Sequence, residues 1–175
     1  MSEEIERRGL LGRIGEELAL QALERNGFYS VRPLRTGHEY ADVYAERDGK
    51  RYAISVKARN KWEKPARPNV KPQLNRRYKL GNAKNCLDLA RRAEEAHDAS
   101  AAWLAIALER ETYDAYFGTL EMLRQIRVKG RALNGKGVMM TPEYLGHYEC
   151  LAKRAPHNLD YDYLKNLPKG TAPPT

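Results

Sequence analysis

Residues 40–59 read YADVYAERDGKRYAISVKAR, and this stretch decides the fold. Two runs in which apolar and polar residues alternate flank the dipeptide Asp48-Gly49, which is typical of tight β-turns. The pattern therefore predicts a β-hairpin with strands over residues 41–47 and 51–58.

The segments on either side of the hairpin predict further helices and strands. Residues 9–26 have helical periodicity and end at Gly27, which favours a helix stop. The other expected elements are a strand at 28–35, a helix at 83–97, a buried strand at 101–109, a paired strand within 111–121, a short strand at 137–140 and a helix begun by Thr141-Pro142. This order predicts the α/β class, with a central mixed β-sheet flanked by helices in the order α-β-β-β-α-β.

The composition suits a soluble globular protein, with 175 residues, 42% of them apolar and 31% charged. We expect a single domain over residues 1–155 and an extended or disordered C-terminal tail over 156–175, which is rich in Pro, Asn and Asp. No apolar run reaches the length of a membrane span and no secretory signal is visible, so a cytoplasmic location is expected. Cys86 and Cys150 are isolated and are interpreted as reduced thiols, although pairing stays open.

The first helix carries two stripes of different character. Leu11, Ile14 and Leu18 recur at helical spacing and are expected to be buried. The second stripe consists mostly of small residues and comprises Gly12, Gly15, Ala19 and Leu23. Glu16 falls within the second stripe, where the helix backbone can approach a sheet closely.

A basic segment follows the hairpin. The net charge is +8, which favours a polyanionic partner and nucleic acid before membrane. Residues 59–84 hold nine Lys or Arg and one acid, and their prolines and asparagines predict a loop. We expect this loop to bind DNA through sequence-nonspecific phosphate contacts, against the alternative of a merely solvated loop. The expected binding residues are Arg59, Asn60, Lys61, Trp62, Lys64, Arg67, Lys71, Arg76, Arg77 and Lys79.

The stretches GRIGEELALQALERNGF and YADVYAERDGKRYAISVKAR together resemble the PD-(D/E)xK nuclease superfamily. The layout is similar to that of archaeal Holliday-junction resolvases and small bacterial proteins related to them, over residues 9–59. The resemblance implies a restriction-endonuclease-like core. It places the helix glutamate of the family at Glu16, the second-strand aspartate at Asp42 and the third-strand lysine at Lys57.

The resemblance also implies a chemistry, that of a metal-dependent DNA endonuclease that hydrolyses phosphodiesters and selects substrates by structure. Mg²⁺ or Mn²⁺ would be held by Asp42, Glu16 and the backbone carbonyl of Val56, since these ions take hard oxygen ligands. Lys57 would serve the attacking water and offset negative charge. Resolvase-like relatives work as dimers, so a homodimer is expected.

Ser55 is the fourth candidate catalytic residue, beside Glu16, Asp42 and Lys57, but it departs from the family pattern. The family would carry Glu, Asp or Gln at this position, two residues before the lysine. A hydroxyl adds no charge, so three explanations stay open. In the first, Glu16 and Asp42 alone are sufficient for catalysis. In the second, the site is degenerate and binds nucleic acid without cutting it. In the third, the missing acid is supplied from another position in the chain. The candidates for a moved acid are Glu63, Asp88 and Glu94, and His38 and Glu39 are weighed as helpers against a plain loop role.

Overall fold

The hairpin predicted from the sequence is present in the computed structural model, which describes residues 3–34, 40–63, 65, 67–80, 86–132 and 137–159. Strands β2 (Val43–Arg47) and β3 (Lys50–Asn60) pair antiparallel. Asp48 and Gly49 join them with φ angles of 53° and 74°. Two successive positive φ angles define the type I′ turn, whose twist matches that of the paired strands.

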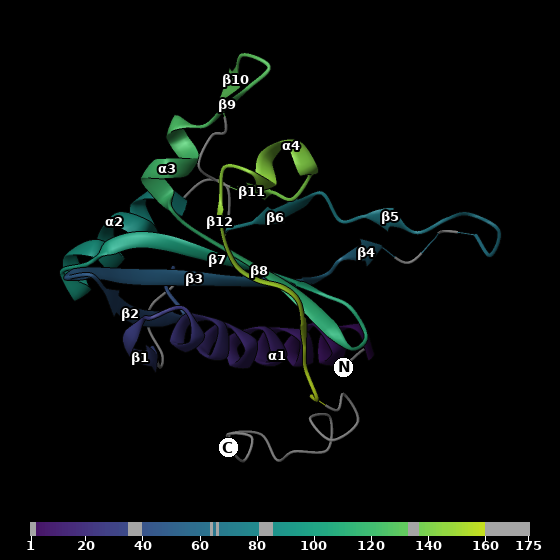
Figure 1. Cartoon of the computed structure of the whole chain (residues 1–175), viewed down its shortest axis with the longest axis horizontal. Coiled ribbons are helices and arrows are strands. Elements are labelled where there is room, and N and C mark those ends of the chain that lie inside the picture. The colour runs from purple at the N-terminus through teal and green to yellow at the C-terminus, as the bar shows by residue number, and fades with distance from the viewer. Residues whose placement is uncertain are drawn as a thin grey trace.

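This hairpin belongs to a six-stranded sheet with the order β1-β2-β3-β7-β8-β12 (Figure 1). The other strands of the sheet are β1 (Tyr29–Pro33), β7 (Ser100–Leu108), β8 (Thr112–Thr119) and β12 (Glu149–Pro156). β3 and β7 run parallel, whereas the other neighbouring pairs run antiparallel. The predicted α/β class with a mixed sheet is confirmed.

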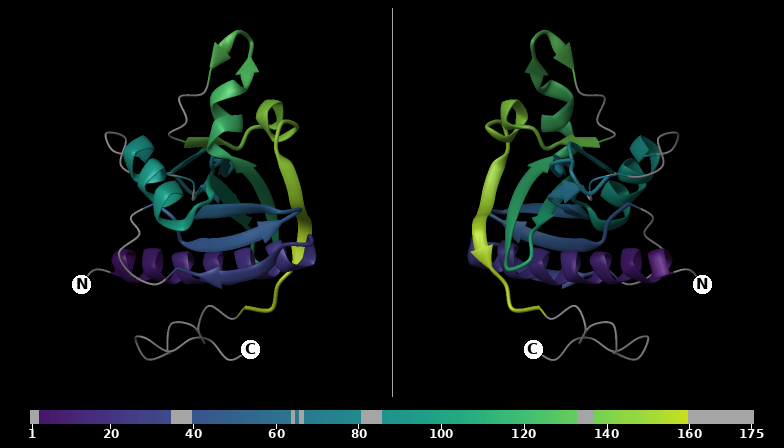
Figure 2. Two further views of the ribbon diagram at one scale, coloured as in Figure 1. Left: turned by 90° about the vertical axis from the view of Figure 1, so that its left-hand side faces the viewer. Right: turned by 90° about the vertical axis from the view of Figure 1, so that its right-hand side faces the viewer.

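Helices cover both faces of the sheet, and Figure 2 shows the arrangement from two sides. The helices are α1 (Glu3–Arg25), α2 (Cys86–His97), α3 (Leu120–Gln125) and α4 (Pro142–Leu145). Side chains of β3 alternate between the faces: Ile54 joins a core with α1, and Ala53 joins a core with α2 and α3. No helix in the described part of the chain is long and apolar enough to cross a membrane.

Three two-stranded pieces lie outside the main sheet. β4 (Trp62–Glu63) pairs with β5 (Gln73–Leu74), β6 (Arg77–Lys79) with β11 (Gly137–Met139), and β9 (Arg127–Val128) with β10 (Arg131–Ala132). The β4–β5 piece extends to one side of the sheet, and the β9–β10 hairpin projects in another direction (Figure 1).

One end of the sheet is held closed by contacts between β2 and β12. The Arg47 guanidinium donates to both carboxylate oxygens of Glu149 at 2.7 Å and stacks 4.1 Å from the centre of the Phe28 ring. Asn26 donates to the carbonyl of Leu151 at 2.8 Å, which adds the end of α1 to the same junction. These charge-assisted and stacking contacts join β2 and β12 to the residues that follow α1.

The structure corrects several boundaries. α1 begins at Glu3 rather than at residue 9. The predicted loop at 59–84 contains β4, β5 and β6, because backbone pairing with distant partners such as β11 overrides its loop-like composition. β12, α3 and the β9–β10 hairpin were not predicted.

The C-terminal boundary is also revised. Pro156 pairs with Thr112 at the end of β12, and the amide of His157 donates to the carbonyl of Glu111 at 3.0 Å. The sheet therefore holds the chain past residue 155, and residues 160–175 of the expected tail lie outside the described residues. Cys86 is buried and Cys150 is exposed, with no disulfide between them.

Candidate active site

The site lies where β2 separates from β3. Val43 pairs with Ile54 in the register of the two strands, and the amide of Asp42 still donates to the carbonyl of Ile54 at 2.8 Å. Further along β3, a side chain replaces the backbone as the partner: the Asp42 carboxylate accepts the N–H of Val56 at 2.8 Å. The carbonyl of Asp42 meanwhile accepts from Leu34 at 2.9 Å, on the side of β1. β3 thus continues beyond β2 with an open edge.

The carbonyl of Val56 faces this same open edge. The N–H and C=O groups of one strand residue point to the same side, and the N–H of Val56 already meets Asp42. Ala58, two residues further along β3, presents its backbone to the same side. The open edge therefore offers a carboxylate and backbone carbonyls next to one another.

Helix α1 reaches this edge because Gly15 allows a close approach. A methyl group at Gly15 would overlap the side chain of Ala58, whereas one at Gly12 would meet open space. The close contact predicted from the small stripe of the helix is therefore confirmed at Gly15. It brings the next residue, Glu16, to the open edge of β3.

A cleft of about 430 Å³ collects these groups. Its lining residues come from α1, β3, β6 and the residue before β2, and they are Gly12, Glu16, Asp42, Val56, Lys57, Ala58, Arg59 and Lys79. The structure thus brings together Glu16, Asp42 and Lys57, which the sequence placed on three separate elements.

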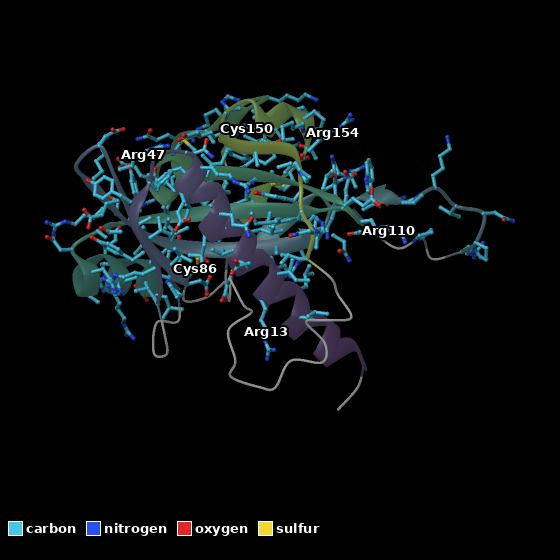
Figure 3. The ribbon with its side chains drawn as sticks, turned by 60° about the horizontal axis from the view of Figure 1, so that its bottom comes forward. Arg13, Arg47, Cys86, Arg110, Cys150 and Arg154 are labelled. Atoms are coloured by element: carbon cyan, nitrogen blue, oxygen red, sulfur yellow. The ribbon has the colours of Figure 1, made fainter. Side chains whose placement is uncertain are left out.

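The pKa values of both carboxyl groups in the cleft, those of Asp42 and Glu16, are raised. Burial raises the pKa of Asp42, against the opposing effects of Lys57 and the Val56 amide. Burial also raises the pKa of Glu16, the negative charge of Asp42 raises it further, and Lys57 and Arg13 act in the opposite direction. Arg13 extends from α1 away from the strands (Figure 3). Arg13 was not predicted, although its position one helical turn before Glu16 is a usable signal.

Lys57 is near both carboxyl groups but bound to neither. Its charge lowers the pKa of Asp42 and of Glu16. Among the residues that the structure describes, Lys57 forms no hydrogen bond or ion pair. Its ammonium group is therefore available to a molecule that enters the cleft.

Ser55 lies beneath the site rather than in it. Its side chain is 0% exposed, and its hydroxyl has no hydrogen-bond partner within the described structure. It sits beside Trp103 in the register of β3 and β7 and does not line the cleft. A serine here fills space in the core on the α2 side of the sheet.

Within the described chain, no further acid lines the cleft in place of the third-strand acid that the family carries at the position of Ser55. The Glu94 carboxylate accepts the N–H of Ala101 at 2.9 Å, and Asp88 is exposed beside Arg91 at 4.0 Å. Glu63 is exposed on β4, and none of the three lines the cleft. His38 and Glu39 lie outside the described residues. Within the described ranges, no group of three or more His, Cys, Asp and Glu side chains is placed to hold a metal ion.

The residues predicted to bind DNA differ in their surroundings: some line the cleft, some have partners within the protein, and others are exposed. Arg59 and Lys79 line the cleft. Lys61 instead pairs with Asp114 at 3.0 Å, and the half-exposed Trp62 donates its indole N–H to Glu109 at 3.0 Å. The remaining exposed members are Asn60, Arg67, Lys71, Arg76 and Arg77, while Lys64 lies outside the described residues.

Similarity of this chain to known proteins is found among solved structures. No family model matches the chain, and no curated protein matches it. A solved structure that is similar to this chain is that of Hjc, a Holliday junction resolvase from the archaeal hyperthermophile Archaeoglobus fulgidus. The two are 16% identical with a TM-score of 0.47, over 77% of this chain and 91% of the resolvase.

Proposed function

We propose that the protein is a metal-dependent endonuclease that hydrolyses DNA phosphodiesters. The observation that carries the proposal is the convergence of Glu16, Asp42 and Lys57 in one cleft at the open edge of β3. Acids with raised pKa values in a cleft, beside a lysine that has no ion-pair partner among the described residues, support a functional site over a structural ion pair. The PD-(D/E)xK pattern of the sequence supports the same reaction.

The donor set of the cleft fits Mg²⁺ or Mn²⁺. Asp42, Glu16 and the carbonyl of Val56 would hold the ion, which takes hard oxygen ligands and completes its shell with water and substrate phosphate. Two carboxylates and a carbonyl are few ligands, but they match the way in which Mg²⁺ is held at phosphate-processing sites. The ion would supply Lewis-acid polarisation of the phosphate and a more acidic water.

The residues of this chain supply the remaining requirements of the reaction. The ammonium group of Lys57 orients the attacking water and offsets charge that develops on the phosphate oxygens. Arg59 and Lys79, at the rim, bind the flanking phosphates of the strand. The exposed Arg76 and Arg77 extend the basic surface along the chain from Lys79. We also propose that the enzyme acts as a homodimer, with one cleft for each strand.

A second candidate is a module that binds nucleic acid without cutting it. It is favoured by Ser55, since the third-strand acid is absent and no acid of the described chain takes its place. In that case the cleft would keep its basic rim, and the two carboxyl groups would lack the ligands for a productive ion.

A cleavage assay separates the two candidates. Supercoiled plasmid, linear duplex and branched duplex are incubated with Mg²⁺ or Mn²⁺ and, in parallel, with chelator. The nuclease predicts metal-dependent cutting that is lost in Asp42→Asn and in Lys57→Met. The matched control is Asp88→Asn, which neutralises an exposed acid outside the cleft and should cut like the wild type. Salt-sensitive binding with no cutting by any preparation would favour the second candidate.

A further inference from the structure

The β9–β10 hairpin is a small basic ribbon that projects from the body of the protein (Figures 1 and 2). Its turn residues Lys129 and Gly130 have φ angles of 49° and 73°, so the tip is a tight type I′ turn. The segment from 122 to 132 contains four basic residues, Arg124, Arg127, Lys129 and Arg131, and no acid.

The base of the hairpin is anchored while its tip is exposed. The Arg127 guanidinium donates to the carbonyls of Arg124 and Ile126, at 2.8 and 3.2 Å, where α3 ends. Val128 packs against the core on the α2 side of the sheet. Arg124, Lys129 and Arg131 are exposed, and the nearest acid to Lys129 is an exposed Glu143 at 4.0 Å, a separation that contributes little.

The chain connects this hairpin to the cleft over a short distance. Ala132 ends β10 and Gly137 begins β11, so only four residues lie between them and their Cα atoms are at most about 18 Å apart. Gly137 pairs with Lys79, which lines the cleft. The neighbouring Arg77 side chain runs along the backbone at Gly137. The exposed Lys79 and Arg77 therefore extend positive charge from the cleft along β6 to the strand that follows the hairpin in the chain.

We propose that the β9–β10 hairpin is a second DNA-binding element, which holds duplex DNA at a distance from the cleft. The inference rests on the proposed function, because it assigns that function a duplex substrate longer than the cleft itself. Lys129 and Arg131 contact phosphates across a groove, and Arg124 contacts the backbone beside them. A two-stranded ribbon is of the width that the major groove of B-form DNA admits.

The geometry favours a stiff duplex over other nucleic acids. The cleft and the projecting hairpin are separate points of contact, and a duplex is straight over short spans, since its persistence length is about 50 nm. A flexible single strand loses more conformational entropy when it is held at both points. Duplex RNA has a deep, narrow major groove that excludes a protein ribbon.

The test compares two hairpins of this protein, each of which presents one exposed Lys and one exposed Arg at or beside its turn. Lys129→Gln/Arg131→Gln alters the β9–β10 hairpin, and Lys50→Gln/Arg51→Gln alters the β2–β3 turn at the closed end of the sheet. Each pair removes two exposed positive charges, and each includes one exposed ion pair, Lys129 with Glu143 or Arg51 with Asp98. Binding is measured by fluorescence anisotropy with chelator present and over a range of salt, and cutting is measured separately with Mg²⁺.

On a duplex of about 40 base pairs, we expect the β9–β10 variant to bind about tenfold more weakly than the control at low salt. We also expect the slope of log affinity against log salt to fall by about 1.8, since each lost phosphate contact removes about 0.9. On a duplex of about 10 base pairs, one helical turn, both variants should bind like the wild type.

Other results would overturn the inference. Equal affinities and slopes of the two variants on the long duplex would remove the hairpin from the interface. Equal dependence on the hairpin for duplex RNA of the same length would remove the assignment to DNA. Failure of the proposed function is distinguishable: hairpin-dependent binding without any cutting overturns the nuclease and keeps the DNA contact, whereas cutting with no effect of the hairpin does the reverse.

Discussion

Two aspartates, Asp42 before β2 and Asp114 on β8, have similar hydrogen bonds to the backbone but opposite shifts of their pKa values. Each carboxylate accepts a backbone N–H at 2.8 Å, from Val56 and from Arg154 respectively. Asp114 also binds Lys61 at 3.0 Å and Lys153 at 3.4 Å. Asp42 has Lys57 nearby, but no ion pair within the described chain.

The pKa values follow from this difference. Burial raises the pKa of Asp114, but the N–H of Arg154 and the two lysines outweigh burial, so the net direction is downward. For Asp42 burial prevails over Lys57 and the amide, so its pKa is raised. The negative charge of Asp114 is compensated by two paired lysines. The negative charge of Asp42 has no ion-pair partner among the described residues. We propose that this contrast separates a structural acid, Asp114, from a catalytic acid, Asp42.

The largest expected effect is on cutting. Asp42→Asn should lower the rate of DNA cleavage by about 10³-fold, because it removes a charged ligand while the amide oxygen still accepts from Val56. Its thermal stability at pH 7 should not fall, since an acid whose pKa is raised by folding is more easily ionised in the unfolded chain. Single-turnover cleavage and thermal melting measure the two effects, and a melting temperature lowered as far as that of an Asp114 variant would break the contrast.

The reverse pattern is expected at Asp114. Asp114→Ala leaves Lys61 and the Arg154 amide without their partner, and should reduce the free energy of unfolding by about 3 kcal/mol. Residual folded protein should still cut DNA at a rate near that of the wild type. Urea denaturation combined with cleavage at low temperature tests both statements, and loss of cutting at full stability would assign Asp114 to the site.

The opposite pKa shifts of Asp114 and Asp42 also predict how the stability of Asp114 variants depends on pH. The pKa of Asp114 is lowered in the folded protein, so its contribution to stability is present above the unfolded-state value of about 3.9 and is lost as pH falls through the folded-state value. The stability difference between wild type and Asp114→Asn should therefore be constant near pH 7 and shrink towards pH 3. A difference that grows on acidification would show that the pKa of Asp114 is raised.

Two glycines of α1 provide a smaller and well-matched comparison. Gly15→Ala should reduce stability by about 1–3 kcal/mol, because the added methyl overlaps Ala58 and pushes Glu16 away from Asp42. Gly12→Ala, one helical turn earlier, meets open space and should gain about 0.5–1 kcal/mol from helix propensity. Urea denaturation of both variants checks the pair, and equal effects would remove the tight contact between α1 and β3.

The smallest effect is expected at Ser55. Its buried hydroxyl has no partner, so Ser55→Ala should leave stability unchanged or raise it by about 1 kcal/mol. Cutting should stay within about threefold of the wild type if Ser55 only fills space below the site. A loss of cutting at unchanged stability would instead give the hydroxyl a place in catalysis.

Local patterns were sufficient to predict the elements that carry the site. Strand alternation and the Asp48-Gly49 turn predicted the hairpin, and the small stripe of α1 predicted the close approach at Gly15. The grouping of Glu16, Asp42 and Lys57 followed from these elements and the family resemblance. The catalytic roles of these residues remain predictions.

What the sequence did not predict depends on contacts between distant segments. β6 pairs with β11, far along the chain, and Lys79 of β6 lines the cleft. Lys61 was expected to bind DNA, but the approach of β8 brings Asp114 to it. The basic run at the β9–β10 hairpin was readable from its charges, yet nothing local indicated that it projects from the body.

We propose that the carboxylate of Asp42 takes a metal ion, whereas that of Asp114 does not. A crystal soaked in Mn²⁺ tests it directly through the anomalous difference density. We expect a peak about 2.1 Å from oxygens of Asp42 and Glu16, on the side of the Val56 carbonyl, and none beside Asp114. No peak at Asp42, or an ion held elsewhere in the molecule, would contradict the account.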